Sequence, residues 1–263
     1  AGRPLSMQRF PDGIGEKGFY QKEAPGYFPA WIRRASIRVE GTGENQPQVI
    51  CDEAATLVYL ANQNCITPHL WLSRLGGRAG PEPLDHPDRL IFDLDPPAGA
   101  FELARAAAAS LRALLEELGL AAFLMTTGSR GLHVAAPLDG RADFDAARAF
   151  AHQVAQRLAR RKPDKLTTET RKAERNGRLF LDYLRNAYAA TSVAPYAVRA
   201  RPGAPVATPL DWGELDDGRL RSDRYTLKNI FRRLGQKGDP WQGITAAPGS
   251  LAAARRRLAE LDA

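Results

Sequence analysis

An apolar segment that ends in two aspartates, 89–97, constrains this chain more than any other part of the sequence. Side chains alternate between the two faces of a β-strand, so Asp93 and Asp95 would share one face while the apolar residues beside them are buried on the other. Pro96 and Pro97 follow at once and cannot continue a hydrogen-bonded strand. The sequence therefore predicts two carboxylates at the end of a strand, where open α/β sheets bind their ligands.

The spacing of the two carboxylates favours a bound cation. Two like charges this close destabilise each other unless a positive charge lies between them. Hard oxygen ligands of this kind suit Mg²⁺ or Mn²⁺. A polar strand end that turns into a loop is the simpler interpretation of an isolated Asp-x-Asp, because the pattern is short and common.

A glycine-containing turn, 127–131, lies between two apolar segments and predicts a β-hairpin. Its two glycines permit positive φ angles and a close approach of a ligand to the backbone. Thr127, Ser129 and Arg130 of the turn, with His133 in the following strand, are suited to binding phosphate oxygens through charge-assisted hydrogen bonds. A hairpin with a basic tip and no ligand is the alternative.

A third carboxylate, Asp182, ends another alternating strand pattern at 178–182. Beside the first two it would complete a cluster that holds two divalent ions about 3.5–4 Å apart, as in phosphoryl transfer enzymes. Further along, Arg199 and Arg201 are two residues apart, so a strand would direct both guanidinium groups to one side. Taken alone, Asp182 fits a surface strand position equally well.

These segments together resemble the polymerase domain of bacterial ligase D, which belongs to the archaeo-eukaryotic primase superfamily and acts in non-homologous end joining. Four motifs carry the resemblance. In chain order, the first two are shared by wider primase-polymerases, and the last two narrow the match to the ligase D type. The motifs are Phe-Asp-Leu-Asp-Pro at 92–96, Gly-Ser-Arg-Gly-Leu-His-Val at 128–134, Leu-Asp-Tyr-Leu-Arg-Asn at 181–186 and Ala-Pro-Tyr-Ala-Val-Arg-Ala-Arg at 194–201.

The resemblance implies an α/β (α+β) chain with the archaeo-eukaryotic primase fold, in which an RRM-like catalytic module packs on an N-terminal α/β module. We expect 1–263 to form a single primase-polymerase domain. Its parts would be an N-terminal module over 1–88, a catalytic module over 89–215 and C-terminal helices over 216–263.

Local patterns predict the individual elements of this fold. We expect strands at 16–23, 35–40, 166–168 and 178–182, a polar turn at 41–47, a hairpin over 123–137 and a charged loop at 169–177. We expect helices at 53–63 with Asp52 as N-cap, 101–118 closed by Gly119, 143–160 capped by Asp143, 222–234, and 250–261 capped by Ser250.

The resemblance also implies a reaction. The chain would be a template-directed nucleotidyltransferase that extends a DNA 3′-hydroxyl with a nucleoside triphosphate, preferably a ribonucleotide, with Mn²⁺ serving better than Mg²⁺. Asp93 and Asp95 would hold both of two ions and Asp182 the ion nearer the primer hydroxyl. The triphosphate would be bound by Thr127, Ser129, Arg130, His133 and Arg199.

An aromatic pair, Phe19 and Tyr20, lies between Lys17 and Lys22. Adjacent strand residues point to opposite faces, so at most one can face the core, and the exposed ring is able to stack on a base. In the family this pair packs against the template strand; two ordinary strand aromatics are the alternative. The other expected DNA-binding residues are Arg201 and, in the 169–177 loop, Arg171, Lys172 and Arg175, for which a solvated basic loop is the alternative.

Composition bears on partners and location. The net charge of +7 favours a polyanionic partner. The two cysteines give no disulfide framework, which predicts a reducing compartment, and no apolar stretch is long enough to span a membrane. We therefore expect a cytoplasmic protein of the bacterial nucleoid whose partners are gapped or overhanging DNA ends and nucleoside triphosphates, with Ku and a DNA ligase module, fused or separate, implied by the resemblance.

Two other functions remain open from the sequence, a non-catalytic module that binds or aligns DNA ends and a primase that starts strands without a primer. An intact set of three carboxylates is not needed for binding alone and would repel phosphate without metal ions. Family members usually carry a further N-terminal segment that contributes to a pocket for the 5′-phosphate of a DNA end. Because this sequence starts after that segment, we expect little discrimination between phosphorylated and unphosphorylated ends.

Overall fold

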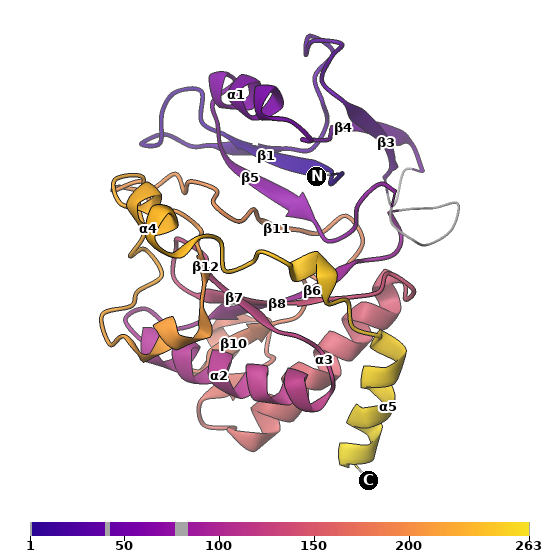
Figure 1. Ribbon diagram of the computed structural model, residues 1–263, viewed down its shortest axis with the longest axis vertical. Helices are drawn as coiled ribbons and strands as arrows, with labels where there is room; N and C mark the ends of the chain where they lie inside the picture. The colour runs from indigo at the N-terminus through magenta and orange to yellow at the C-terminus, as the bar shows by residue number, and fades with distance from the viewer. Residues whose placement is uncertain (1, 40–42, 77–83, 263) are drawn as a thin grey trace.

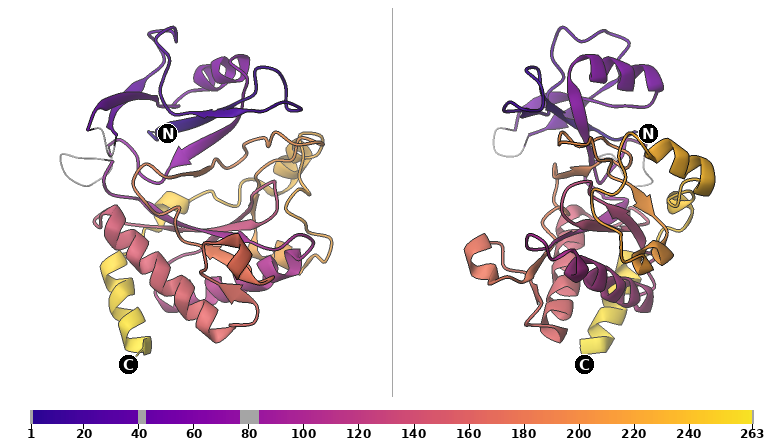
Figure 2. Two further views of the ribbon diagram at one scale, coloured as in Figure 1. Left: turned by 180° about the vertical axis from the view of Figure 1, so that it is seen from behind. Right: turned by 90° about the vertical axis from the view of Figure 1, so that its left-hand side faces the viewer.

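The computed structural model describes residues 2–39, 43–76 and 84–262, and it has a mixed α/β architecture. Figure 1 shows a smaller sheet with one helix above a larger sheet that is covered from below by helices. The side and rear views of Figure 2 show the same two layers, with α5 running beside α3. None of the helices in the described ranges is long and apolar enough to cross a bilayer.

The larger sheet has the strand order β12-β7-β8-β6-β10-β9, and every neighbouring pair is antiparallel except β9 and β10. The predicted hairpin is present as β7 and β8. The acidic segment is β6, which lies between β8 and β10. The strands are β6 (Arg89–Asp95), β7 (Phe123–Thr126), β8 (Leu132–Pro137), β9 (Leu166–Thr167), β10 (Leu179–Asp182) and β12 (Pro209–Leu210).

Alternation along β6 separates the hydrophobic core from the acidic face. Phe92 and Leu94 are fully buried and pack in one cluster with residues of α2 (Phe101–Glu117) and α3 (Phe144–Arg161). Asp93 and Asp95, in the alternate positions, lie on the opposite face of the sheet, toward the smaller sheet. This confirms the burial pattern expected from the sequence.

The two long helices begin and end where the sequence predicted. The Asp143 carboxylate accepts a hydrogen bond from the Ala146 backbone N–H at 2.8 Å and caps α3. Gly119, which follows α2, has a φ of +76° that suits a glycine at a helix end. The helix α5 (Leu251–Asp262) packs against α3, with the Ser250 hydroxyl 3.5 Å from the Ala253 N–H.

The smaller sheet has the order β11-β5-β1-β2 and joins distant parts of the chain. β11 pairs with β5, so a segment that follows the acidic strands completes the N-terminal sheet. A separate hairpin and α1 cover this sheet. The elements are β1 (Leu5–Arg9), β2 (Phe19–Gln21), β3 (Arg34–Arg38), β4 (Asn45–Val49), α1 (Ala54–Asn62), β5 (Cys65–Trp71) and β11 (Thr191–Val193).

Several local predictions for the N-terminal region differ from the structure. The strand expected at 16–23 is limited to β2, and β1 and β5 were not predicted. Of the turn expected at 41–47, residues 41–42 lie outside the described residues and Asn45–Pro47 belong to β4. Asp52 is not the N-cap of α1, which is Glu53, because the Asp52 carboxylate instead binds Arg33 and the Gly2 backbone N–H.

The helix expected at 222–234 begins later, as α4 (Ile230–Lys237). The residues before it form turns and a short pairing with a neighbouring loop instead of a helix: the Val206 N–H donates to the Tyr225 carbonyl oxygen at 2.7 Å and the Leu227 N–H to that of Ala204 at 3.1 Å. Long-range backbone pairing thus prevails over helical periodicity here. Short 3₁₀ helices are η1 (Lys172–Arg175), η2 (Trp212–Asp216) and η3 (Ile244–Ala246).

Candidate active site

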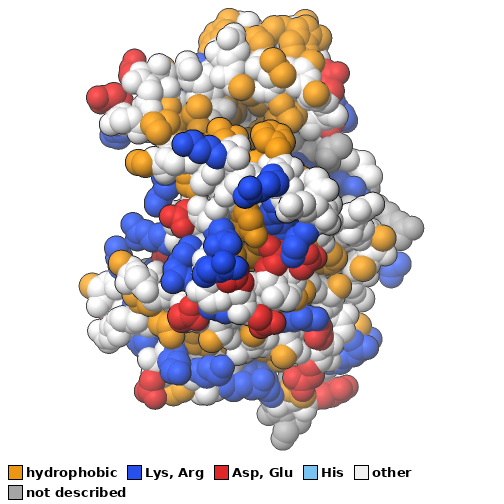
Figure 3. Space-filling view, turned by 60° about the vertical axis from the view of Figure 1, so that its left-hand side comes forward, with side chains coloured by type: hydrophobic (Ala, Val, Ile, Leu, Met, Phe, Trp, Pro, Cys, Tyr) orange, Lys and Arg blue, Asp and Glu red, His pale blue; other side chains and the backbone are white. Residues whose placement is uncertain are grey.

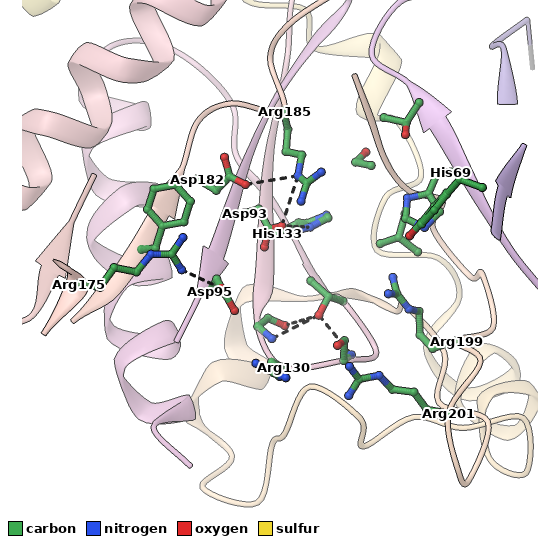
Figure 4. A pocket seen from close by; sticks show the side chains of 18 residues that line it. His69, Asp93, Asp95, Arg130, His133, Arg175, Asp182, Arg185, Arg199 and Arg201 are labelled. Atoms are coloured by element: carbon green, nitrogen blue, oxygen red, sulfur yellow. Dashed lines mark hydrogen bonds and ion pairs between the residues drawn. The ribbon is translucent and has the colours of Figure 1, made fainter. Parts of the chain in front are cut away.

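A cavity of about 450 Å³ lies between the acidic face of the larger sheet and the edge of the smaller sheet. Figure 4 shows that its side chains converge from both layers. The residues that line it are Tyr20, His69, Asp93, Asp95, Thr127, Ser129, Arg130, Gly131, His133, Arg175, Phe180, Asp182, Arg185, Thr191, Ser192, Val193, Arg199 and Arg201.

Three polar side chains form a row across adjacent strands of the larger sheet. Asp93 of β6 is directly opposite His133 of β8 on one side and Asp182 of β10 on the other. Asp95 lies two positions along the same face. The register of β10 thus brings the third predicted carboxylate to the first two, although the sequence separation between them is large.

Arginines compensate the charge of the carboxylates. The Arg185 Nε lies 3.4 Å from Asp182 Oδ2 and 3.7 Å from Asp93 Oδ2, so one guanidinium group bridges the two strands. The Arg175 Nη1 lies 3.3 Å from Asp95 Oδ2, and its guanidinium packs 4.0 Å from the centre of the Phe180 ring. Figure 4 shows both arginines directed at the acids.

The two opposed aspartates have different electrostatic surroundings. Burial raises the pKa of Asp182, and the negative charge of Asp93 adds to this effect while Arg185 opposes it. Burial acts on Asp93 in the same direction, but His133, Arg185 and Arg199 together hold the pKa of Asp93 below its usual value. Asp93 is therefore the more strongly ionised of the pair.

The three carboxylates supply the hard oxygen donors that Mg²⁺ or Mn²⁺ prefers. Within the described ranges, no three His, Cys, Asp or Glu side chains are close enough together to form a preassembled metal site. The bridging guanidinium of Arg185 nevertheless shows that the space between Asp93 and Asp182 accepts a positive charge. The donor set thus fits divalent cations once the arginine moves, and nearly half of the Arg185 side chain is exposed.

The turn between β7 and β8 presents polar groups to the same cavity. Gly128 has a φ of +64°, and a side chain at Gly131 would collide with the Leu94 carbonyl oxygen, so both positions require glycine. The Thr127 hydroxyl is directed into the turn, where it accepts the N–H groups of Ser129 and Gly131 at 3.3 Å. Ser129 and Arg130 line the cavity.

Arg199 and Arg201 both line the cavity, but the strand that was expected to align them is absent. Only Val198 pairs in a β-bridge, with Val206, and the segment from Arg199 onward forms a turn. Burial lowers the pKa of Arg199, and the neighbouring charge of Arg201 acts in the same direction.

The cavity contains residues that the sequence analysis did not select. His69 was not among the predicted site residues, yet it lines the cavity, and the centre of its ring lies 5.3 Å from that of Tyr20. Burial, with help from Arg199 and Arg185, lowers the pKa of His69 to about 3, so the ring is neutral. Arg185 could have been selected from the sequence, because it is the third residue after Asp182. His69 could not, because its place in the cavity depends on β5, a strand that was not predicted.

The residues expected to contact DNA are divided between the cavity and its surroundings. Tyr20 and Phe19 are 57% and 46% exposed on β2, so both rings are available. Arg175 is not a free loop residue, because it is bound to Asp95. Lys17, Lys22, Arg171 and Lys172 are not among the described residues that line the cavity; Lys22 donates to the Ala189 carbonyl oxygen and Arg171 pairs with Glu174.

Comparisons with known proteins agree with this geometry. Residues 1–241 match the family model described as "LigD, primase-polymerase domain". The chain is 35% identical over 253 residues to the multifunctional non-homologous end joining DNA repair protein LigD of Mycobacterium tuberculosis, covering 94% of this chain and 32% of that protein. It is 34% identical over 266 residues to LigD of Pseudomonas aeruginosa, and this match covers 97% of this chain and 30% of that protein. The chain thus spans about a third of the length of these relatives.

A solved structure supports the same relationship. The polymerase domain from Mycobacterium tuberculosis ligase D, in complex with DNA, superposes with a TM-score of 0.86 at 32% sequence identity. The match covers 95% of this chain and 86% of that one. The likeness therefore extends over both sheets rather than over the acidic strands alone.

Proposed function

Because this chain belongs to the LigD primase-polymerase domain family, we propose that it adds nucleotides to DNA 3′ ends in a template-directed reaction during non-homologous end joining. The observation that carries the proposal is the direct opposition of Asp182 and Asp93 beside a cavity rich in arginine. A module that only bound DNA would gain nothing from acidic side chains at the centre of a basic site.

In this proposal Asp93 and Asp95 hold both of two Mn²⁺ or Mg²⁺ ions and Asp182 holds the ion nearer the primer. When bound, the ions would lower the pKa of the primer 3′-hydroxyl and offset the charge of the phosphates. The chain's own contribution is to fix the carboxylates on adjacent strands, so that they need no rearrangement of the backbone. His133 supports Asp93, with its Nε2 3.5 Å from Asp93 Oδ2.

The incoming nucleoside triphosphate would be bound on the other wall of the cavity. Ser129 and Arg130 of the turn line the same cavity as the carboxylates, together with His133 and Arg199. Figure 4 shows Arg130, His133 and Arg199 around this space. Charge-assisted bonds of this kind are the strong ones in phosphate recognition. We expect ribonucleotides to be preferred and Mn²⁺ to serve better than Mg²⁺.

DNA would approach across the basic face of the molecule. In Figure 3, Lys and Arg side chains gather over the middle of this face, with acidic side chains between them. Phe19 and Tyr20 would stack on the template, while the remaining contacts would go to phosphates, which gives binding a steep salt dependence. The phosphate contacts would come from Lys17, Lys22, Arg171, Lys172 and Arg201. Ku and a DNA ligase module are the expected protein partners.

Primer extension on a gapped duplex tests the reaction. The protein should add the nucleotide complementary to the template, with ribonucleotides used better than deoxynucleotides, and only with Mn²⁺ or Mg²⁺. Tight DNA binding without any nucleotide addition under these conditions would instead identify an end-binding module.

A further inference from the structure

A buried serine from the C-terminal part of the chain is hydrogen-bonded into the nucleotide-side turn. Ser222 is 4% exposed, and its Oγ donates to the Gly131 carbonyl oxygen at 2.8 Å and accepts the Ser129 backbone N–H at 3.2 Å. The Thr127 hydroxyl lies 3.1 Å away as a third partner. One hydroxyl has one proton and two lone pairs, so these contacts use its full hydrogen-bonding capacity.

The same C-terminal segment also holds the loop that carries Arg199. Three to five residues after Ser222, the backbone of 225–227 pairs with that of 204–206, and the Arg199 N–H donates to the Pro205 carbonyl oxygen at 2.7 Å. The segment therefore contacts both elements proposed to bind the triphosphate.

The two nucleotide-binding elements are packed against each other without free space. A Cβ atom at Gly128 would lie 2.7 Å from the Arg199 Cγ and 3.0 Å from the Ala207 nitrogen. A small displacement of the turn would thus change its distance from the Arg199 guanidinium. Ser222 holds the turn through its hydrogen bonds but is not itself among the described residues that line the cavity.

A buried ion pair anchors the segment. The Arg233 Nη2 lies 2.6 Å from Glu214 Oε2, and the two side chains are 6% and 10% exposed. The Tyr225 hydroxyl donates to the other oxygen of Glu214 at 2.6 Å. The segment that carries Ser222 is thereby tied to η2 and α4 and has little freedom to move with the turn.

We propose that Ser222 is a positioning residue for the incoming nucleotide, which holds the 127–131 turn in the conformation that presents Ser129 and Arg130 to the triphosphate. This inference rests on the proposed function, because it requires that the turn bind phosphate. Ser222 touches neither substrate nor metal; it acts by keeping the donors of the turn preorganised, which reduces the ordering cost of nucleotide binding.

The test compares two buried serines. Ser222→Ala removes the hydroxyl that holds the turn, and Ser73→Ala is the matched control, because Ser73 is fully buried and its hydroxyl has no hydrogen-bond partner among the described residues. Ser222→Ala should raise the nucleotide KM in gapped-duplex primer extension about tenfold, with kcat within about twofold of wild type. The Kd for gapped DNA should not change, and Ser73→Ala should match wild type in all three constants.

A double-mutant cycle with Thr127→Val adds a second readout. Thr127 and Ser222 belong to one hydrogen-bonded network, so the double variant should raise KM by much less than the product of the single effects. Tyr225→Phe removes the hydroxyl that ties the segment to Glu214 outside the cavity, so it should also raise the nucleotide KM, and it keeps the inference testable should Ser222→Ala fold poorly.

Unchanged nucleotide KM in Ser222→Ala, or multiplicative effects in the cycle, would overturn the positioning role while leaving the proposed function intact. Wild-type protein that uses no nucleotide would instead refute the proposed function, and the positioning role with it.

Discussion

Asp182 lies directly opposite Asp93 in the antiparallel pair of β10 and β6, so two carboxylates from distant segments share one face of the sheet. Arg185 bridges them, and the more exposed Asp95 is paired with Arg175. The acidic face is therefore charge-compensated by arginines that a divalent cation would have to displace.

This arrangement predicts a specific effect of Arg185→Ala. Loss of the bridging charge leaves the opposed carboxylates uncompensated, so the free energy of unfolding in EDTA should fall by about 1 kcal/mol, while Mn²⁺ should stabilise the variant more than wild type. Thermal melts with and without Mn²⁺ measure both effects. Arg219→Ala, which removes an exposed ion pair with Asp217, is the control and should show neither change.

Arg199 and Arg201 should have separable roles although both line the cavity. Arg199→Ala should raise the nucleotide KM about tenfold or more, because a charge-assisted bond to phosphate is lost, and leave the Kd for DNA nearly unchanged. Arg201→Ala should weaken DNA binding and change the nucleotide KM little. Steady-state kinetics and DNA titrations decide the assignment, and the reverse pattern would exchange the two roles.

The exposed aromatic pair should contribute to template binding. Replacement of Phe19 or Tyr20 by alanine should cost about 1–3 kcal/mol of DNA-binding free energy if a base stacks on that ring. Phe231→Ala is a matched control, because Phe231 is 74% exposed but lies on α4 rather than on β2, which carries the aromatic pair. Equal losses for all three variants in fluorescence anisotropy would argue against a specific stacking site.

His69 predicts how stability depends on pH. Its pKa is about 3 in the folded protein, so between that value and about 6.5 the unfolded chain binds a proton that the folded protein does not. The free energy of unfolding therefore falls as the pH decreases through this range, by about 1–2 kcal/mol between pH 7 and pH 5. In urea denaturation at pH 7 and pH 5, His69→Gln should lack this part of the decrease in the free energy of unfolding. An equal decrease in the variant and in wild type would mean that His69 titrates normally.

Much of the candidate site follows from local sequence patterns. Alternation over 89–97 was sufficient to place Asp93 and Asp95 on one face, and the glycines of 127–131 were sufficient to predict the hairpin turn. Both predictions depend only on residues that are neighbours in the chain. The strand character of 178–182 was equally local. The register that sets Asp182 opposite Asp93 came from the structure.

The remaining features depend on contacts between distant segments. His69 enters the cavity because β5 pairs with β11, and Ser222 reaches the 127–131 turn because its segment forms a turn and a β-bridge instead of the expected helix. Arg175 was predicted to contact DNA from the charged loop, with a solvated loop position as the alternative, and the fold places it beside Asp95. Periodicity within one segment carries no information on such pairings.

Nucleotide addition by Asp93→Asn, compared with wild type at equal DNA occupancy, tests the central claim most directly. The substitution keeps the size of the side chain and removes the charge proposed to hold the metal ions. Extension of a gapped duplex by Asp93→Asn in Mn²⁺ should fall by about a thousandfold or more, while the Kd for DNA should stay the same or become slightly tighter. Extension at close to the wild-type rate would contradict the assignment of Asp93, Asp95 and Asp182 as the metal-binding catalytic centre.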